Sequence, residues 1–289
     1  MVSTPLKLWV RDGLSVLSWA ARVVCRPSAS GVRILVYHAI AEIAPPQDRW
    51  RLAVPPALFA AQLRWLRRHG YAVVSLEEAV AMIEGRRPMR RKAVAITFDD
   101  GFQDTLTQAY PMLQRERMPM TLFVVAGCLD AGRPFSWLEH PARFSPPLTW
   151  EELQRLAADP LVTIGSHGWS HQCLSALSPS EQARDIYTSQ AALEARLGRA
   201  VTWFAYPFGH RRSFSAETIG CLQRHRFRAA CANVMGLNRV GDSPWTLKRT
   251  RIGWEDRLWR FRLKMAGAYD WVDGVRLPSG ASPTCERGV

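Results

Sequence analysis

The sequence predicts an α/β fold with a parallel sheet, because short apolar or β-branched runs alternate with longer segments of helical periodicity. The runs predicted to form strands cover residues 32–37, 93–98, 120–125, 161–166, 201–206 and 227–231. The segments predicted to form helices cover residues 57–69, 76–84, 104–117, 149–158, 178–197 and 213–225. This alternation fits either a closed barrel or an open doubly wound sheet.

Two of the predicted helices carry signals that mark where they begin. Thr149 stands three residues before Glu152, and Ser178 stands three residues before Glu181. A hydroxyl residue followed at this spacing by a glutamate is typical of a capping box, in which each side chain bonds the other residue's backbone N–H. Helices are therefore expected to begin next to Thr149 and Ser178.

Polar residues follow several of the predicted strands at the point where each strand ends. His38 follows the first strand, Asp99 and Asp100 follow the second, and His167 follows the strand at 161–166. The sequence Pro207-Phe208-Gly209 follows the strand at 201–206. Because parallel strands in α/β folds present their carboxyl ends at one face, where active sites are built, these residues are expected to converge.

The converging residues have the composition of a metal site with a neighbouring base. His167 and His171 are four residues apart, a spacing that places both imidazoles on one side of a helical turn. Two imidazoles and one carboxylate can hold a divalent cation and leave positions open for water and substrate. We assign Asp100 as the third ligand and Asp99 as the base that takes a proton from the attacking water.

An aspartyl phosphatase is excluded by the spacing of the carboxylates. In that pattern a nucleophilic aspartate is followed two residues later by a second aspartate. Gly101 stands two residues after Asp99, and Phe102 stands two residues after Asp100. The adjacent pair therefore belongs to a different chemistry.

The motifs "TFDDG" (97–101), "SHGWSH" (166–171) and "YPFG" (206–209), in this order, resemble the NodB-type polysaccharide deacetylases. "TLFVV" (121–125) and "LTWEEL" (148–153) are also similar to connecting elements of that family, and the resemblance covers residues 31–255. It implies a distorted (β/α) barrel, a divalent metal that is most often Zn²⁺ (Co²⁺ or Ni²⁺ being alternatives), and hydrolysis of an N-acetyl group from an amino sugar.

The resemblance also implies a role for individual residues. Asp99 corresponds to the catalytic base, and the metal ligands correspond to Asp100, His167 and His171. The backbone N–H of Phe208 corresponds to the donor that stabilises negative charge on the acetyl oxygen. The same motif implies that Tyr206 and Pro207 contact the substrate.

The sequence departs from the usual family pattern at two positions. Ala205 stands where an arginine usually steadies the base, and Arg249 from another strand is the candidate replacement. No histidine follows His225, although a histidine late in the chain usually protonates the leaving amine. In the branch that deacetylates poly-N-acetylglucosamine, the strands are circularly permuted and an early Tyr-His supplies this acid. Tyr37-His38 matches it, the alternative being that His38 is a half-buried structural histidine.

Residues 31–255 are predicted to form one catalytic domain, because nothing in their composition marks an internal boundary. Residues 256–289 form a predicted basic and aromatic helical extension. Residues 1–30 form a predicted amphipathic helical extension, in which apolar residues within 5–25 lie opposite basic and hydroxyl residues. Charges interrupt this segment too often for a secretory signal or a spanning helix, so a cytoplasmic protein is expected. The helix could lie peripherally on the inner membrane or cap the domain's own core.

The chain of 289 residues has a formal net charge of +13, with basic residues concentrated in 86–92 and 247–264. A basic surface attracts nucleic acid or anionic lipids. Because residues 86–92 directly precede the strand at 93–98, they lie at the opposite end of that strand from Asp99, which favours docking to a membrane or partner over nucleic acid. The six cysteines lack a CxxC pair and are predicted to be free thiols.

The sequence therefore predicts a metal-dependent hydrolase that removes N-acetyl groups from amino sugars in a cell-surface polysaccharide or its lipid-linked precursor. The chemistry of attack on a carbonyl leaves two enzymatic alternatives open, a deformylase and an O-acetyl esterase acting on a lipid-linked sugar. The alternative from another class is a basic protein that binds nucleic acid or membranes and has no activity.

Overall fold

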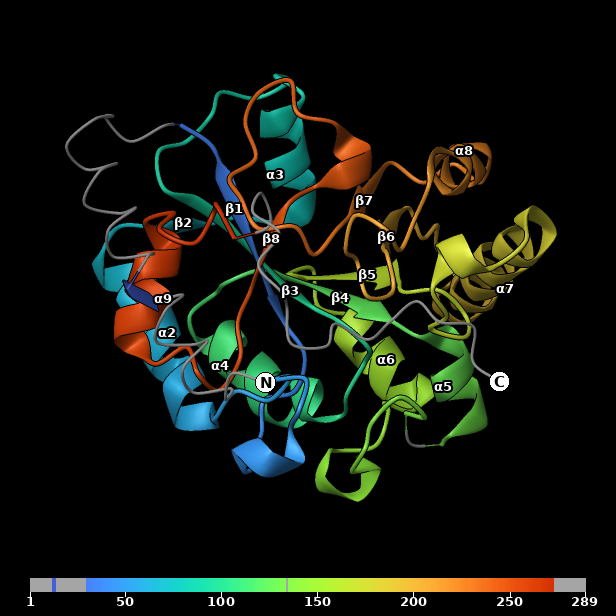
Figure 1. Cartoon of the computed structure of the whole chain (residues 1–289), viewed down its shortest axis with the longest axis horizontal. Helices are drawn as coiled ribbons and strands as arrows, with labels where there is room; N and C mark the ends of the chain where they lie inside the picture. Colours follow the sequence, from blue (N-terminus) through green and yellow to red (C-terminus); the bar gives the residue numbers. More distant parts are fainter. Residues whose placement is uncertain (1–11, 14–29, 134, 273–289) are drawn as a thin grey trace.

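The computed structural model describes residues 12–13, 30–133 and 135–272. At its centre is a sheet in which every pair of named strands is parallel (Figure 1). The strands lie in the order β7-β6-β5-β4-β3-β1-β8, and β2 pairs with β3. Their bounds are β1 (Val32–Tyr37), β2 (Ala72–Val73), β3 (Ala93–Phe98), β4 (Met120–Val124), β5 (Val162–Ser166), β6 (Trp203–Ala205), β7 (Ala229–Cys231) and β8 (Arg249–Arg251).

The sheet closes almost completely into a barrel through the segment that leads into β8. Leu247 pairs with Cys231 of β7, and its N–H donates to the carbonyl oxygen of Ala230 over 3.0 Å. Two residues later β8 begins, and β8 pairs with β1. The segment 247–251 therefore joins the β7 edge to the β1 edge. The prediction of a distorted (β/α) barrel is confirmed, and the open doubly wound alternative is wrong.

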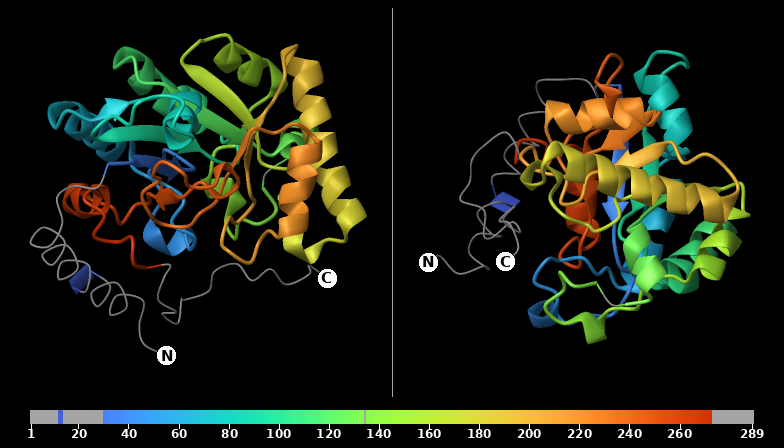
Figure 2. Two further views of the ribbon diagram at one scale, coloured as in Figure 1. Left: turned by 90° about the horizontal axis from the view of Figure 1, so that it is seen from above. Right: turned by 90° about the vertical axis from the view of Figure 1, so that its right-hand side faces the viewer.

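Helices lie around the outside of this barrel (Figures 1 and 2). They are α2 (Pro56–Arg68), α3 (Leu76–Ile83), α4 (Tyr110–Arg115), α5 (Ala126–Ala131), α6 (Trp150–Ala157), α7 (Pro179–Leu197), α8 (Ala216–Arg224) and α9 (Leu258–Met265). Complete capping boxes start α6 at Thr149 and α7 at Ser178, as the sequence predicts. The predicted helix 104–117 differs, because its first part is a π-helix (Thr105–Ala109) that continues into α4.

The central strands β1 and β3 are buried along their whole length. At their carboxyl ends, the rings of Tyr37 and Phe98 stack with centroids 5.6 Å apart, and Phe59 of α2 packs on both. The Tyr37 hydroxyl donates to Gln62 over 2.9 Å. Aromatic pairs of this kind add about 0.5–1.5 kcal/mol beyond the area that they bury. This packing fixes the ends of the two strands that lead to His38 and Asp99.

Part of each predicted extension is described. Phe261 and Met265 of α9 are buried in the same core cluster as the strands, so the described part of the predicted C-terminal extension packs on the barrel. Of the predicted N-terminal extension only residues 12–13 and 30 are described. The Asp12 carboxylate accepts a hydrogen bond from the Tyr269 hydroxyl over 2.8 Å and pairs with Arg260. The rest of the N-terminal prediction lies outside the described residues.

The cysteines differ from the prediction at one position. Cys128, Cys221 and Cys231 are free, whereas Cys173 is disulfide-bonded, so the prediction of free thiols is wrong at Cys173.

None of the helices that the structure describes is both long enough and apolar enough to cross a membrane.

A buried carboxylate joins the loop after β1 to the loop after β3. Asp104 is 5% exposed, and its Oδ1 atom accepts the Ile40 N–H over 2.8 Å. Its Oδ2 atom accepts the Ser145 hydroxyl over 2.8 Å. Burial raises the pKa of Asp104 to about 6, against the opposing effect of the two hydrogen bonds. The folded state therefore holds the Asp104 proton more tightly than the unfolded chain does.

This difference predicts a pH dependence of stability. Because the pKa of Asp104 is higher in the folded state, its contribution to the free energy of unfolding falls as the pH rises from about 4 to about 6, by about 3 kcal/mol. In Asp104→Asn, the amide can keep both contacts but cannot ionise. Urea unfolding at pH 4 and pH 7 should show this extra loss in the wild type relative to Asp104→Asn. Equal losses in both proteins would contradict the assignment.

Candidate active site

The adjacent carboxylates Asp99 and Asp100 lie at the carboxyl end of β3. The Asp99 N–H still donates to Tyr37 of β1 over 3.0 Å, but Asp100 adopts φ of 72° and Gly101 φ of 92°. Gly101 is required here, because a Cβ would lie 3.0 Å from Val124 in addition to the strained φ. The strand therefore ends in a tight turn at the point where the sequence predicted it.

Arg249 of β8 holds the Asp99 carboxylate in a two-pronged ion pair. Its Nη1 and Nη2 atoms lie 2.7 Å from Asp99 Oδ1 and Oδ2 respectively, and both side chains are fully buried. Arg249 Nε also donates to the Ala232 carbonyl oxygen over 3.3 Å. Burial alone would raise the pKa of Asp99, but the charge of Arg249, supported by His167, lowers it to about 2. The structure thus places Arg249 where the sequence suggested a replacement for the arginine absent at Ala205.

His167 is oriented by a hydrogen bond on the far side of its ring. Its Nδ1 lies 2.7 Å from the carbonyl oxygen of Ala205, which makes Nδ1 the protonated nitrogen and leaves Nε2 as the free acceptor. Nε2 faces Asp100 Oδ1 at 3.6 Å. The ring is buried.

His171 also reaches Asp100, but not through the helical turn that the sequence predicted. Residues 167–171 form a loop in which Gly168 has φ of 78° and His171 φ of 57°. His171 Nε2 nevertheless lies 3.4 Å from Asp100 Oδ1. The helical explanation of the spacing is therefore wrong, because left-handed residues reverse the chain, although the two imidazoles do lie close together.

Asp185 of α7 fixes the loop at 167–171 through hydrogen bonds to its backbone. Its carboxylate accepts the backbone N–H groups of Trp169 and Ser170 over 2.9 Å each, and the Ser170 hydroxyl. Gly168 is required beside it, because a Cβ at that position would lie 2.6 Å from Asp185 Oδ1. No motif in the sequence pointed to Asp185, since it lies in the middle of a helix and its role depends on a contact with a distant loop.

Asp100, His167 and His171 fit a divalent cation. One nitrogen or oxygen atom of each lies within 4.8 Å of the others. Ligand atoms bound tetrahedrally to one zinc ion are about 3.4 Å apart, close to the observed 3.4 Å and 3.6 Å. Asp100 Oδ1 is buried and has no hydrogen-bond partner among the described residues. Burial and the neighbouring Asp99 raise the pKa of Asp100 well above its usual range, and a cation would offset that repulsion.

His38 lies at the end of β1 and is 7% exposed. Burial lowers its pKa to about 3, and the charges of Asp99, Arg249 and His167 are close enough to affect it. Its Nδ1 atom is buried without a hydrogen-bond partner in the described part of the chain. The structure therefore brings the predicted acid to the same site as the predicted base, in the neutral form.

Phe208 occupies a tight turn that the loop after β7 supports. It has φ of 62°, and its N–H has no hydrogen-bond partner among the described residues. Its carbonyl oxygen accepts Asn233 Nδ2 over 3.1 Å, and the Asn233 N–H donates to Gly209 over 2.7 Å. The Phe208 ring lies 5.0 Å from the ring of His171. Asn233 is a contact that the sequence did not reveal, because it lies outside the recognisable motifs.

Tyr206 lies differently from the prediction that it and Pro207 contact substrate. Tyr206 is fully buried, its hydroxyl donates to the Trp245 carbonyl oxygen over 3.0 Å, and its ring stacks on Phe214 at 4.0 Å. Pro207 is buried against the Gly168 turn. The Tyr206 side chain therefore supports the site from the core, which corrects its predicted role, whereas contact of Pro207 with substrate stays a prediction.

Trp137 forms a wall of the site that sequence reasoning missed. It lies in the loop between α5 and α6, and its ring stacks on His171 with centroids 3.9 Å apart and an interplanar angle of 19°. The ring of Phe135 also packs against the ring of Trp137, with centroids 4.8 Å apart. Because the loop is long and lacks a motif, only the fold shows that Trp137 reaches a candidate ligand.

A nearly closed parallel barrel with ionisable side chains at the carboxyl ends of its strands has the architecture of a (β/α)-barrel enzyme. The sequence profile of the family described as "Polysaccharide deacetylase" matches residues 86–235, just over half of the chain. The chain belongs to this family. Its members are hydrolases that act on the amide bond of N-acetylated sugars, so the predicted family and enzyme class are confirmed.

Individual relatives agree with this assignment. A Bacillus subtilis (strain 168) protein whose name places it among the polysaccharide deacetylases is 26% identical over 219 residues, 76% of this chain and 70% of that protein. The poly-beta-1,6-N-acetyl-D-glucosamine N-deacetylase of Escherichia coli (strain K12) is 29% identical over 182 residues, 57% of this chain but only 25% of its own length. The structure of IcaB from Ammonifex degensii matches with a TM-score of 0.70 and 28% identity, over 84% of this chain and 98% of that one.

Proposed function

We propose that this chain is a divalent-metal-dependent deacetylase that removes N-acetyl groups from amino sugars in a cell-surface polysaccharide or its lipid-linked precursor. The observation that carries the proposal is the buried Asp99, which is paired with Arg249 and lies beside a separate group of three candidate ligands. The names of the Escherichia coli and other relatives support an N-acetylated glycan as the substrate class.

The two carboxylates divide the work of hydrolysis. A divalent cation held by Asp100, His167 and His171 would supply Lewis-acid chemistry toward the acetyl carbonyl and the water. Asp99 is the base, because its low pKa keeps it ionised and it can take the proton of the attacking water at a carboxylate oxygen. Arg249 fixes the plane of that carboxylate and compensates its charge.

His38 is the group that returns a proton to the leaving nitrogen. Since its pKa is about 3, it is neutral in the resting site. The proton that Asp99 takes from the attacking water therefore passes to a ring nitrogen of His38, which then gives it to the leaving nitrogen, so that both residues return to their resting states. The neighbouring ionised Asp99 favours the protonated form of His38.

The Phe208 N–H is the donor for negative charge on the acetyl oxygen. A fixed backbone donor of this kind contributes when charge develops in the transition state, and losing one costs about 10²–10³ in rate. The left-handed conformation of Phe208 costs of order 1–2 kcal/mol, so the turn depends on its contacts. Asn233, which bonds both Phe208 and Gly209, is therefore a positioning residue.

Replacing Asn233 by alanine should lower kcat about 10-fold while KM and metal content stay unchanged, because the donor is misplaced but not removed. Acetate release measured over a range of substrate concentrations separates kcat from KM. Gln223→Ala, which removes an exposed amide on α8, is the matched control and should have no effect. An unchanged kcat in Asn233→Ala would contradict the positioning role.

Metal removal tests the proposal as a whole. Dialysis of the protein against a chelator should lower acetate release from N-acetylglucosamine oligomers more than 100-fold, and added Zn²⁺, Co²⁺ or Ni²⁺ should restore it. Atomic spectrometry should find one metal ion per chain in the active protein and none after chelation. Undiminished acetate release from metal-free protein would overturn the proposed metal dependence.

A substrate panel distinguishes the remaining alternatives. The same attack on a carbonyl would serve an N-formyl sugar or an O-acetyl ester, so these compounds are compared with N-acetylated polymers and lipid-linked saccharides. N-acetyl substrates should react fastest. Cytoplasmic location and peripheral contact with the inner membrane stay predictions, which fractionation of cells and liposome flotation would test.

A further inference from the structure

The strand that carries Arg249 is short. β8 has three residues, and it pairs with β1 over those three residues only. Arg249 is the first of them, so the geometry of its two-pronged pair with Asp99 depends on where β8 lies along the barrel. Because a displacement of about 1 Å near the reacting groups can cost about 10²-fold in rate, the contacts that fix β8 bear on the reaction.

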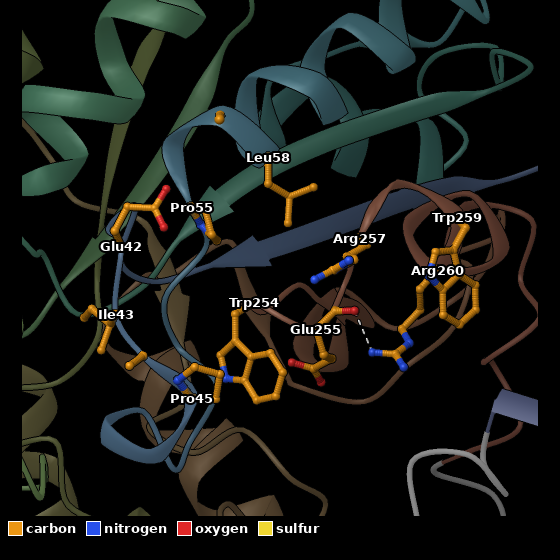
Figure 3. A pocket seen from close by; sticks show the side chains of 12 residues that line it. Glu42, Ile43, Pro45, Pro55, Leu58, Trp254, Glu255, Arg257, Trp259 and Arg260 are labelled. Atoms are coloured by element: carbon orange, nitrogen blue, oxygen red, sulfur yellow. Dashed lines mark hydrogen bonds between the residues drawn. The ribbon is translucent and has the colours of Figure 1, made fainter. Parts of the chain in front are cut away.

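The turn that follows β8, residues 253–256, borders a cavity. The cavity has a volume of about 820 Å³, and Trp254 and Glu255 of the turn line it together with the loop after β1 and the start of α2 (Figure 3). Packing of the turn is therefore incomplete on that side. Its position depends on polar contacts, which come in part from α9 and α2.

Two side chains of α9 hold the end of β8 and this turn. Arg260 Nη1 donates to the carbonyl oxygen of Glu255 over 2.6 Å (dashed line in Figure 3). One helical turn further on, the Lys264 ammonium donates to the Arg251 carbonyl oxygen over 2.7 Å and to Asp256 Oδ2 over 2.6 Å. Lys264 is 5% exposed and Asp256 is fully buried. A single buried ammonium thus binds both the last residue of β8 and the turn after it.

The same turn is joined to the end of β1. Gln62 of α2 is fully buried, and its Nε2 atom donates to the Asp256 carbonyl oxygen over 2.9 Å. Its Oε1 atom accepts the Tyr37 hydroxyl over 2.9 Å, and His38 follows Tyr37 in the chain. The turn is therefore connected to the strand end that carries the proposed acid as well as to β8.

We propose that Lys264 is a positioning residue for the base, because it fixes β8 and with it the Arg249 guanidinium that holds Asp99. The inference rests on the proposed function and deepens it, since it makes α9, which lies outside the residues matched by the family profile, part of the catalytic unit. The ammonium has three N–H donors, so it can hold the Asp256 carboxylate and the β8 carbonyl oxygen at the same time. Loss of Lys264 therefore releases β8 even where the Asp256 charge is removed with it.

A double variant separates this role from the stability of a buried ion pair. Lys264→Met alone leaves the Asp256 charge buried without its counter-charge, which is strongly destabilising. Lys264→Met with Asp256→Asn removes both charges and keeps an acceptor for the Gly253 N–H, which lies 2.9 Å from Asp256 Oδ2, so its urea midpoint should stay close to that of the wild type. Its kcat for acetate release should nevertheless fall about 10-fold, with KM and metal content unchanged. Arg262→Met, which removes an exposed arginine of α9, is the matched control and should change none of these.

Hydrogen exchange gives a readout that needs no turnover. Arg249 Nε donates to the Ala232 carbonyl oxygen over 3.3 Å, and exchange of this N–H with solvent, followed by NMR, should be about 10-fold faster in the double variant. A wild-type kcat in the double variant, or a lowered kcat with unchanged exchange at Arg249, would overturn the positioning role and leave the deacetylase intact. Absence of acetate release from the metal-loaded wild type would instead overturn the proposed function, and the role at the base with it, whatever the exchange rates.

Discussion

Asp99→Asn is expected to reduce acetate release by about 10³-fold and to leave the metal in place. The amide cannot take a proton from water at neutral pH, and loss of a general base costs about 10²–10⁴ in rate. The three candidate ligands are unchanged in this variant, since Asp100, His167 and His171 form a separate group. Atomic spectrometry and acetate release on the same sample separate the two functions.

His171→Ala is the contrasting variant. It removes one of three ligand atoms, and with it the ring on which Trp137 stacks. Metal affinity should fall more than about 100-fold. Even the loss of a residue that only hydrogen-bonds to a metal ligand lowers metal affinity by about 10–100-fold, and His171 is itself a candidate ligand. Loss of the base in Asp99→Asn should therefore leave the metal bound, whereas loss of the ligand in His171→Ala should release it. Full activity in Asp99→Asn, or full metal content in His171→Ala, would contradict the assigned roles.

The Asp99→Asn variant needs a control for folding. Its amide group would face the donor atoms of Arg249, which is fully buried and would lose its counter-charge. Leaving a buried charge unpaired costs about 3–5 kcal/mol. The double variant Asp99→Asn with Arg249→Met removes both charges and should recover most of this loss. If the double variant is stable, holds metal and does not turn over, inactivity cannot be attributed to unfolding.

The sequence predicted the parts of the fold that depend on local pattern. The strands at 32–37 and 93–98 match β1 and β3, because continuous apolar runs bounded by polar residues specify buried strands. The capping boxes fixed the starts of α6 and α7 for the same local reason. Asp99, Asp100, His167 and His171 could be found together because they follow β3 and β5, two strands of one parallel sheet whose carboxyl ends share a face.

The parts that were missed depend on contacts distant in sequence. β8 is three residues long and reads "RTR", so it has no apolar pattern, and it forms because β1 offers an open edge. Trp137, Asp185 and Asn233 reach the site from a loop, a helix and a strand end that share no motif. Tyr206 was misassigned because its motif adjoins the site while its side chain points into the core.

Arg249 is the position at which stability and catalysis are most closely joined. Arg249→Met should lower the free energy of unfolding by about 3–5 kcal/mol, because it leaves Asp99 buried next to Asp100 without its counter-charge. The pKa of Asp99 should rise, so that the acid limb of the pH–rate profile moves to higher pH and activity at neutral pH falls. Arg67→Met removes an exposed arginine that pairs with Glu116 at 2.7 Å and should cost less than about 1 kcal/mol.

The decisive measurement is the coupling between Arg249 and Asp99. Urea unfolding of Asp99→Asn, Arg249→Met and the double variant closes a thermodynamic cycle. If the two-pronged pair is a single unit, the double variant should be less destabilised than the sum of the two single variants by more than about 2 kcal/mol, because each single change leaves one charge buried alone. Additive losses would mean that the guanidinium does not compensate this carboxylate, and the explanation given for an ionised base in a fully buried site would fail.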